Sequence, residues 1–329
     1  MSYWSSKNRV RKSLALLAAL MPAFLGLLHR PASLAQSPTP VQSALADKLQ
    51  FDVVSIRQNK SGPQGGGGDE PSVNVPSGPE DTFRNTGGVY SAVNMPLNSF
   101  ISFAYKVTTN QRAAFRDSLP DWAKTDGFNL QARTDNHNVT KDQMREMMRS
   151  LLADRFKLVV HYETRQVPVF AVVLAKPGTL GPFLRQHPAD QPCPRIAPPL
   201  GQLGPDAPPP PPRTMDDGFP AICGAFDRLE PTTPGLRREG SRDMPLSMMV
   251  TAFSGLGNLG RPAVDQTGLI GNFDWVIEFL QEAPDQDHPE ISGPRFQEAL
   301  KKQLGLKLVP EKAPVSFLIV DHVEHPSAN

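Results

Sequence analysis

The alternation of apolar and polar positions along residues 49–329 predicts a mixture of strands and helices. A period of two, rich in β-branched and aromatic residues, predicts strands at residues 51–56, 128–132 and 272–279. Apolar residues three and four positions apart predict amphipathic helices at residues 97–107, 140–156, 246–253 and 296–304. The second of these helices opens on Thr140-Lys-Asp-Gln143, the pattern of a capping box.

Two further pairs of short β-branched segments predict antiparallel hairpins. Residues 158–163 and 167–175 flank Thr164-Arg165-Gln166, and residues 306–309 and 315–320 flank a proline-containing connection. The spacing favours one hairpin at the end of each half of the chain.

The same pattern occurs twice. Asn94-Met95-Pro96-Leu97 recurs as Asp243-Met244-Pro245-Leu246, at an offset of 149 residues. Three other short matches follow in the same order at offsets of 145, 150 and 146 residues. We therefore expect an α+β fold of two repeated units, each a mainly antiparallel sheet with two helices packed on it.

Composition divides the chain into five segments. We expect a signal peptide at residues 1–35 and a polar leader at residues 36–48. The first α+β repeat then spans 49–176, a proline-rich linker or insertion 177–217, and the second repeat 218–329.

The first 35 residues have the three parts of a secretory signal. A basic start with Lys7 and Arg9 precedes an apolar run at 14–28 and the small-residue cleavage pattern Ser33-Leu34-Ala35. The alternative is a retained membrane anchor, although about 15 apolar residues fall short of the roughly 20 that a spanning helix needs. The pattern favours cleavage and a periplasmic or secreted protein with no stable membrane span.

Removing these residues changes the formal charge from +1 to −4, because they hold five Lys or Arg and no acid. A mildly acidic chain lacks the basic surface of a nucleic-acid binder. We expect no nucleic-acid partner.

Cys193 and Cys223 are the two cysteines of the chain, and an oxidising compartment favours a disulfide between them. Neither belongs to a Cys-x-x-Cys motif, and no histidine lies within five residues of either. This argues against a pair of catalytic thiols.

The sequence Gly255-Leu256-Gly257-Asn258-Leu259-Gly260 matches a dinucleotide-binding fingerprint by letter. That motif requires a strand before the glycines and a helix after them. Here a helical pattern precedes the glycines and Arg261-Pro262 follows, so a helix that ends in a glycine-rich turn is the better interpretation. No cofactor is expected.

The candidate ligand or partner residues lie in the segment from Arg261 to Asp274 and are Arg261, Asp265, Thr267 and Asp274. One interpretation is an ordered connection in which Asp265 and Thr267 bond nearby backbone groups. The other is a small polar pocket that includes Arg261 and Asp265.

No pattern in the chain predicts a catalytic residue or a metal site. The histidines lack His-Glu-x-x-His spacing, and the Gly-x-Ser-x-Gly and Ser-x-x-Lys motifs are absent. A site assembled from distant residues stays open as an alternative.

Four stretches resemble an uncharacterised, soil-associated family of exported bacterial proteins. They are Phe51-Asp-Val-Val-Ser-Ile-Arg57, Leu151-Leu-Ala-Asp-Arg-Phe-Lys-Leu158 with the following Pro168–Lys176, the run from Arg261-Pro262 to Leu269, and the end from Leu304 to Val315. The resemblance covers nearly the whole mature chain and brings no catalytic residues. It implies an extracytoplasmic sensing or interaction role, because related domains accompany membrane metallopeptidases of the antibiotic-sensor type.

These observations favour an exported, non-catalytic protein that binds an unknown protein or small ligand in the cell envelope. The alternative is an envelope hydrolase with a dispersed active site near the interface between the repeats.

Overall fold

The computed structural model describes residues 49–60, 69–191, 193, 213–281 and 292–327. The predicted signal peptide and leader lie outside these residues, as do residues 192 and 194–212 of the predicted proline-rich linker. The chain contains both strands and helices, as expected, and the sheets are mainly antiparallel. The α+β fold class is confirmed. In the described part of the chain, no helix is both long and apolar enough to cross a membrane.

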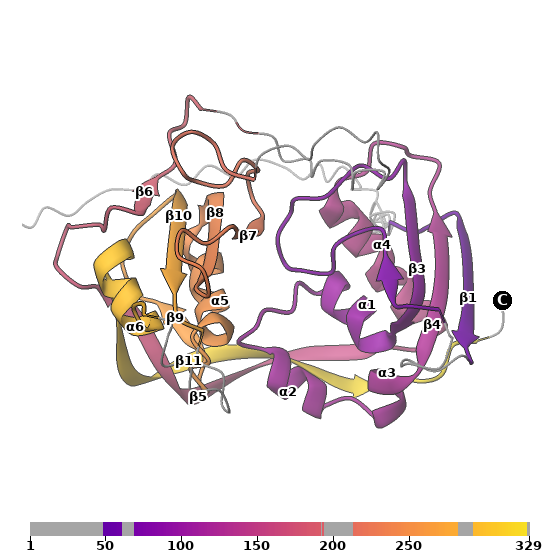
Figure 1. Cartoon of the computed structure of the whole chain (residues 1–329). Coiled ribbons are helices and arrows are strands. Elements are labelled where there is room, and N and C mark those ends of the chain that lie inside the picture. Colours follow the sequence, from indigo (N-terminus) through magenta and orange to yellow (C-terminus); the bar gives the residue numbers. More distant parts are fainter. Residues whose placement is uncertain (1–48, 61–68, 192, 194–212, 282–291, 328–329) are drawn as a thin grey trace, which may run out of the picture. The chain divides into compact units, whose positions relative to one another are not determined.

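The first sheet has four antiparallel strands (Figure 1). Their order is β1 (Val53–Asn59), β4 (Gly127–Arg133), β3 (Val89–Pro96) and β2 (Ser72–Val73). Its helices are α1 (Leu97–Ala104), α4 (Lys141–Arg155) and the shorter α2 (Arg112–Asp117) and α3 (Asp121–Thr125). Apolar residues of the strands, α1 and α4 form one core.

The second sheet also has four antiparallel strands. Their order is β6 (Leu184–Gln186), β10 (Asn272–Phe279), β8 (Arg237–Pro245) and β7 (Phe226–Leu229). Helix α5 (Leu246–Leu256) and helix α6 (Phe296–Ala299), which continues as the π-helical turn η1 (Leu300–Leu304), bury their apolar side chains against it. The strand β6 lies within the segment that was expected to be a linker.

The two sheets share an order of elements. In each, a strand runs directly into a helix, and a central strand, a second helical segment and a long strand follow. The duplication inferred from the sequence stays a prediction, since common element order alone does not establish it.

Helix α4 begins as its sequence predicts. The Thr140 hydroxyl accepts from the Gln143 backbone N–H at 3.1 Å, and the Gln143 side chain accepts from the Thr140 backbone N–H at 2.8 Å. Both bonds of the capping box therefore form, which satisfies two N–H groups at the start of the helix.

The prediction of two hairpins is wrong. Strand β5 (Val159–Leu174) and strand β11 (Leu306–His322) are each continuous, and they pair with each other in antiparallel register from one end to the other (Figure 1). Residues Thr164, Arg165 and Gln166, expected to form a turn, pair with Ser316, Val315 and Pro314. The third sheet consists of this β5–β11 ribbon and the short strand β9 (Ala263–Asp265), which runs parallel to β5.

The β5–β11 ribbon continues through its prolines, because each proline nitrogen lies on the edge that faces away from the partner strand. The N–H of Phe170 bonds to Pro262, and the N–H of Val320 bonds to Ser118, so alternate residues direct their backbone groups away from the partner strand. By the same alternation, Pro168, Pro310 and Pro314 lie on the outer edges, where a missing N–H removes no bond of the ribbon.

The β5–β11 ribbon belongs to both cores. Leu318 and Val320 pack into the first core, and Val172 and Leu306 pack into the second. In the middle of the ribbon the buried face changes, because a separate apolar cluster there packs against Ala114 of α2. The buried members of this cluster are Val169, Ala313, Val315 and Phe317. On the opposite face of the ribbon, the side chains in the middle of both strands, such as Gln166 and Pro314, are exposed.

Candidate functional site

The exposed side chain of Arg261 lies over an aromatic ring. Its guanidinium carbon is 5.6 Å from the centre of the Phe170 ring, a cation–π contact. Asp265 lies four residues after Arg261, and its carboxylate bonds to Thr267. The structure does not join Arg261 and Asp265 by a hydrogen bond or an ion pair among the described residues.

Asp265 and Thr267 form a local turn. One Asp265 oxygen accepts from the Thr267 backbone N–H at 3.0 Å and from the Thr267 hydroxyl at 2.8 Å. The same hydroxyl accepts from the Leu269 N–H at 3.1 Å. These bonds match the interpretation of this segment as an ordered connection.

Asp274 is fully buried at the centre of a charged network. One carboxylate oxygen accepts from His187 Nδ1 at 2.7 Å and from the Asp243 backbone N–H at 3.0 Å, and the other accepts from Arg185 Nε at 3.0 Å. A buried carboxylate is costly unless donors surround it, and here three donors do so. Asp274 thus ties the segment after β6 to the central strand β10.

The network extends outward through Asp217. Burial by itself would raise the pKa of this carboxyl, but hydrogen bonds from Arg185, the Phe219 N–H and Arg242 outweigh burial and hold the pKa below its usual value. Arg185 also lies 4.2 Å from the centre of the Phe219 ring. Positive and negative groups alternate along this network, so each charge has a partner.

The His187–Asp274 pair has the geometry of a carboxylate that orients an imidazole, but the second nitrogen is engaged. His187 Nε2 lies 3.0 Å from the Gln191 carbonyl oxygen, which can only accept, so Nε2 donates. A general base would need this atom free to take a proton from a nucleophile. In the present arrangement the pair has a positioning role.

A second imidazole–carboxylate pair lies on the ribbon. His161 Nδ1 is 2.8 Å and 2.9 Å from the two oxygens of Asp321, and both side chains are about half exposed. Within the described residues, no serine, threonine or cysteine side chain bonds to His161. The neighbouring Glu163 pairs with Arg165 instead, so these groups do not converge on Arg261.

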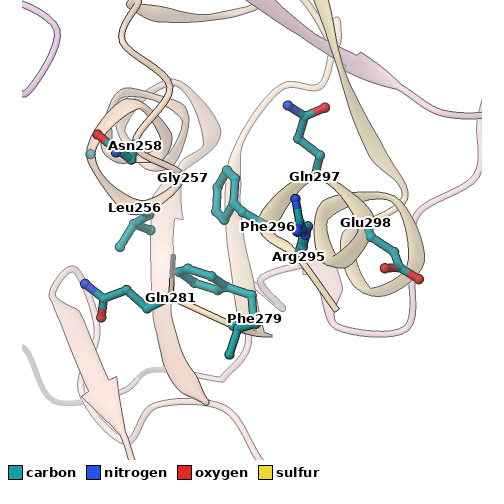
Figure 2. A pocket seen from close by; sticks show the side chains of 11 residues that line it. Leu256, Gly257, Asn258, Phe279, Gln281, Arg295, Phe296, Gln297 and Glu298 are labelled. Carbon is teal, nitrogen blue, oxygen red and sulfur yellow. The ribbon is translucent and has the colours of Figure 1, made fainter. Parts of the chain in front are cut away.

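A pocket with a volume of about 700 Å³ lies between the end of α5 and the start of α6. Figure 2 shows the rings of Phe279 and Phe296 at its centre. Polar side chains surround these rings: Asn258, Gln281, Arg295, Gln297 and Glu298. Pockets of this size suit small molecules, and side-chain amides both donate and accept hydrogen bonds. The arrangement suits a ligand with several hydroxyl or amide groups.

The glycine-rich sequence forms one wall of this pocket. Helix α5 ends at Gly257, as the sequence predicts for a helix followed by a turn. A Cβ on Gly257 would come within 2.2 Å of the Phe296 ring, so the close approach of helix end and ring requires glycine here. The glycines thus shape a pocket between two helices and not a strand-to-helix phosphate loop.

Beside the first sheet, two buried cations on α4 hold a loop by its carbonyl groups. Lys141 Nζ donates to the Glu80 carbonyl at 2.6 Å, and Arg145 donates to the same carbonyl at 2.7 Å. Arg145 also pairs with Asp81 and Asp142. Burial lowers the pKa of Lys141 to about 8. Lys141 Nζ and the terminal nitrogens of Arg145 bond to the protein's own backbone and acids, which indicates a structural role.

The predicted disulfide is present. Cys193 and Cys223 are bonded, with 5.5 Å between their Cα atoms. Cys223 is buried and Cys193 is partly exposed.

The geometry defines an α+β protein with an internally paired charged network around Asp274 and a polar-rimmed pocket between α5 and α6. Comparison with protein families matches residues 98–323 to the family described as "Protein of unknown function (DUF3738)". The match spans more than half of the chain, so the chain belongs to this family. No curated protein and no solved structure matches it. The family description names no activity, so the function has to be inferred from the chemistry of the sites.

Sequence reasoning missed Arg185, His187 and the pocket residues. Arg185 and His187 lie in a segment with few apolar residues, and their partner Asp274 is nearly ninety residues away. The alternation of Phe273, Trp275, Ile277 and Phe279 marked β10 as half buried. A charged residue inside that strand, Asp274, was the available signal that a partner must exist.

Proposed function

We propose that this chain is an exported, non-catalytic binding protein that holds a small polar ligand in the pocket between α5 and α6. The pocket itself carries the proposal. It has room for a small molecule, it has aromatic rings at its centre, and side-chain amides and charges of both signs surround them. Sensing in the cell envelope is a role in which such binding suffices without chemistry.

Two features support the absence of catalysis. Both carboxylate oxygens of Asp274 accept bonds from donors of the protein, and one oxygen of Asp265 accepts two bonds from Thr267. The imidazole of His187 donates from Nε2 to a backbone carbonyl. Asp274 and His187 are therefore held in place, with both carboxylate oxygens and both ring nitrogens engaged.

Thermal unfolding of the purified chain with added probes tests this proposal. The probes are amino sugars, short neutral glycans and di- and tripeptides, which carry the hydroxyl and amide groups that the rim suits. A ligand at roughly 100 times its Kd stabilises the folded state by about 2.7 kcal/mol, so its melting temperature rises measurably.

Matched glutamine variants locate the binding. Gln297→Ala removes an exposed amide from the pocket, and we expect it to reduce the shift caused by a bound probe. Gln166→Ala removes an exposed amide from the β5–β11 ribbon and should leave the shift intact. The proposal is wrong if no probe shifts the melting temperature, or if both variants respond like the parent chain.

The alternative of an envelope hydrolase has one specific observation in its favour. Asp321 orients the half-exposed imidazole of His161, as an acid orients a catalytic base. Hydrolysis of chromogenic esters and amides by the parent chain, lost in His161→Ala and retained in His322→Ala, would favour this alternative over the binding protein.

A further inference from the structure

Three side chains that can bind a metal converge beside the second sheet. His187, Cys193 and Cys223 each place a ligand atom within 4.8 Å of the other two. The two cysteines are joined as a disulfide here. We propose that, once a thiol reductant opens this bridge, the two sulfur atoms and the His187 imidazole bind a Zn²⁺ ion.

A dithiol reductant can open the Cys193–Cys223 disulfide. The dithiol supplies two electrons and two protons to the sulfur–sulfur bond and itself becomes a disulfide, which leaves Cys193 and Cys223 as thiols. Zn²⁺ then displaces the proton of each thiol and the proton on His187 Nε2. Two thiolates and one imidazole are ligands that suit Zn²⁺, and they leave one coordination position for water or a fourth ligand.

The distances require a small rearrangement. A tetrahedral Zn²⁺ with Zn–S bonds of about 2.3 Å and Zn–N bonds of about 2.0 Å separates its ligand atoms by about 3.8 Å or less. The three atoms already lie within 4.8 Å of one another. Once the bridge opens, the two sulfur atoms have to move apart and the imidazole nitrogen has to approach them to reach these distances.

Asp274 prepares His187 for this role. Its carboxylate bonds to Nδ1 of His187 at 2.7 Å and is itself held by Arg185, so the ring orientation is set by a buried group. Metal-binding histidines commonly donate their second nitrogen to a carboxylate in this way. Nε2, which now donates to the Gln191 carbonyl at 3.0 Å, is the atom left for the metal.

The backbone of two ligands is held independently of the bridge. The His187 N–H donates to the Asn272 carbonyl at 2.8 Å. The Cys223 carbonyl accepts from the Thr82 hydroxyl at 2.6 Å, and the next N–H, that of Gly224, bonds to Arg242. Opening the disulfide therefore leaves His187 and Cys223 in place.

Cobalt(II) is the spectroscopic probe for this site. The purified chain is reduced, freed of reductant without oxygen, and titrated with Co²⁺. We expect thiolate-to-cobalt charge-transfer absorption that saturates at one ion per chain and disappears when Zn²⁺ is added. The oxidised chain, with its disulfide intact, should show none of this absorption.

Variants then assign the ligands. Cys193→Ser should remove most of the charge-transfer absorption, and His187→Gln should shift the cobalt spectrum and weaken binding. Asp274→Asn should weaken binding by roughly 10–100-fold, as loss of an outer carboxylate does elsewhere. His137→Gln, at an exposed histidine outside the cluster, is the matched control and should bind as the parent chain does.

The proposal is overturned if the reduced parent chain shows no thiolate–cobalt absorption. It is also overturned if the oxidised chain binds equally well, or if a folded His187→Gln variant keeps the parent spectrum and affinity. Circular dichroism establishes which variants fold. If His187→Gln or Asp274→Asn does not fold, the stoichiometry and the comparison of parent and Cys193→Ser decide the outcome.

Discussion

Asn94 and Asp243 occupy corresponding places in the two sheets. Both have a φ of 50°, and both lie where the register of a strand pair shifts. The backbone N–H of each donates to a side-chain oxygen on the adjacent central strand, to Asn129 at 2.8 Å and to Asp274 at 3.0 Å. In the first sheet the acceptor is a neutral amide, whereas in the second it is the buried acid of the charged network. A shared backbone feature thus holds two different kinds of polar group.

The left-handed backbone at these positions leads to a prediction. Replacing Asn94 or Asp243 by Ala or Gly removes the same side-chain bonds, but only Ala keeps a Cβ in the left-handed region. We expect each Ala variant to be about 1 kcal/mol less stable than the matching Gly variant, measured by urea unfolding. Equal stabilities would show that the backbone at these positions is not left-handed.

The disulfide should contribute measurably to stability. It closes a segment of 30 residues, for which the chain-entropy model gives about 3–4 kcal/mol. We expect the double variant Cys193→Ser/Cys223→Ser to lose free energy of unfolding up to this amount in a metal-free buffer. As a control, a reductant should destabilise the parent chain and leave the double variant unchanged. A double variant as stable as the oxidised parent would contradict the prediction.

Lys141 should make stability depend on pH. Burial lowers the pKa of Lys141 to about 8, whereas a lysine in an unfolded chain keeps a pKa of about 10.4. Between these values the unfolded chain binds more protons than the folded chain, so the free energy of unfolding rises with pH. We expect the stability of the parent chain relative to Lys141→Met to increase between about pH 7 and about pH 10. A difference that stays constant or falls over this interval would contradict the sign of the shift.

Two glycines at the end of α5 should respond to the same substitution by different amounts. Gly257→Ala places a Cβ 2.2 Å from the Phe296 ring and should destabilise by about 1–3 kcal/mol while moving a wall of the pocket. Gly255→Ala meets Thr109 at 3.2 Å and gains helix propensity, so a change of about 1 kcal/mol or less is expected. Thermal unfolding measures both. Similar losses in the two variants would show that crowding against Phe296 is not the cause.

In the segment from Arg261 to Asp274, the sequence predicts some of the contacts at the candidate site and misses others. The local turn of Asp265 and Thr267 could be foreseen, because each bond spans two residues. The partners of Asp274 could not, because Arg185 and His187 approach it only after β6 pairs with β10. The pocket likewise needs α5 and α6 to meet, and their residues lie some forty positions apart.

The sequence by itself determined the features that depend on near neighbours. The periodicity of apolar residues set the bounds of β10, and the Thr140 capping box set the start of α4. The turn predicted after α5 is present, with Asn258 as its left-handed residue at a φ of 46°. The pairing of two cysteines was also within its reach. These features depend on hydrogen bonds and side-chain spacing within a few residues.

The tertiary structure decided whether the proline-containing segments would turn or extend. The sequence predicted two hairpins, since proline and short polar runs usually interrupt strands. In the fold, Pro314 lies opposite Gln166 with its ring nitrogen on the free edge, so β5 and β11 continue through these positions. A strand tolerates proline at a position where no backbone N–H has to bond to the neighbouring strand. Which positions these are depends on the pairing of β5 with β11, whose paired residues lie some 150 positions apart in the sequence.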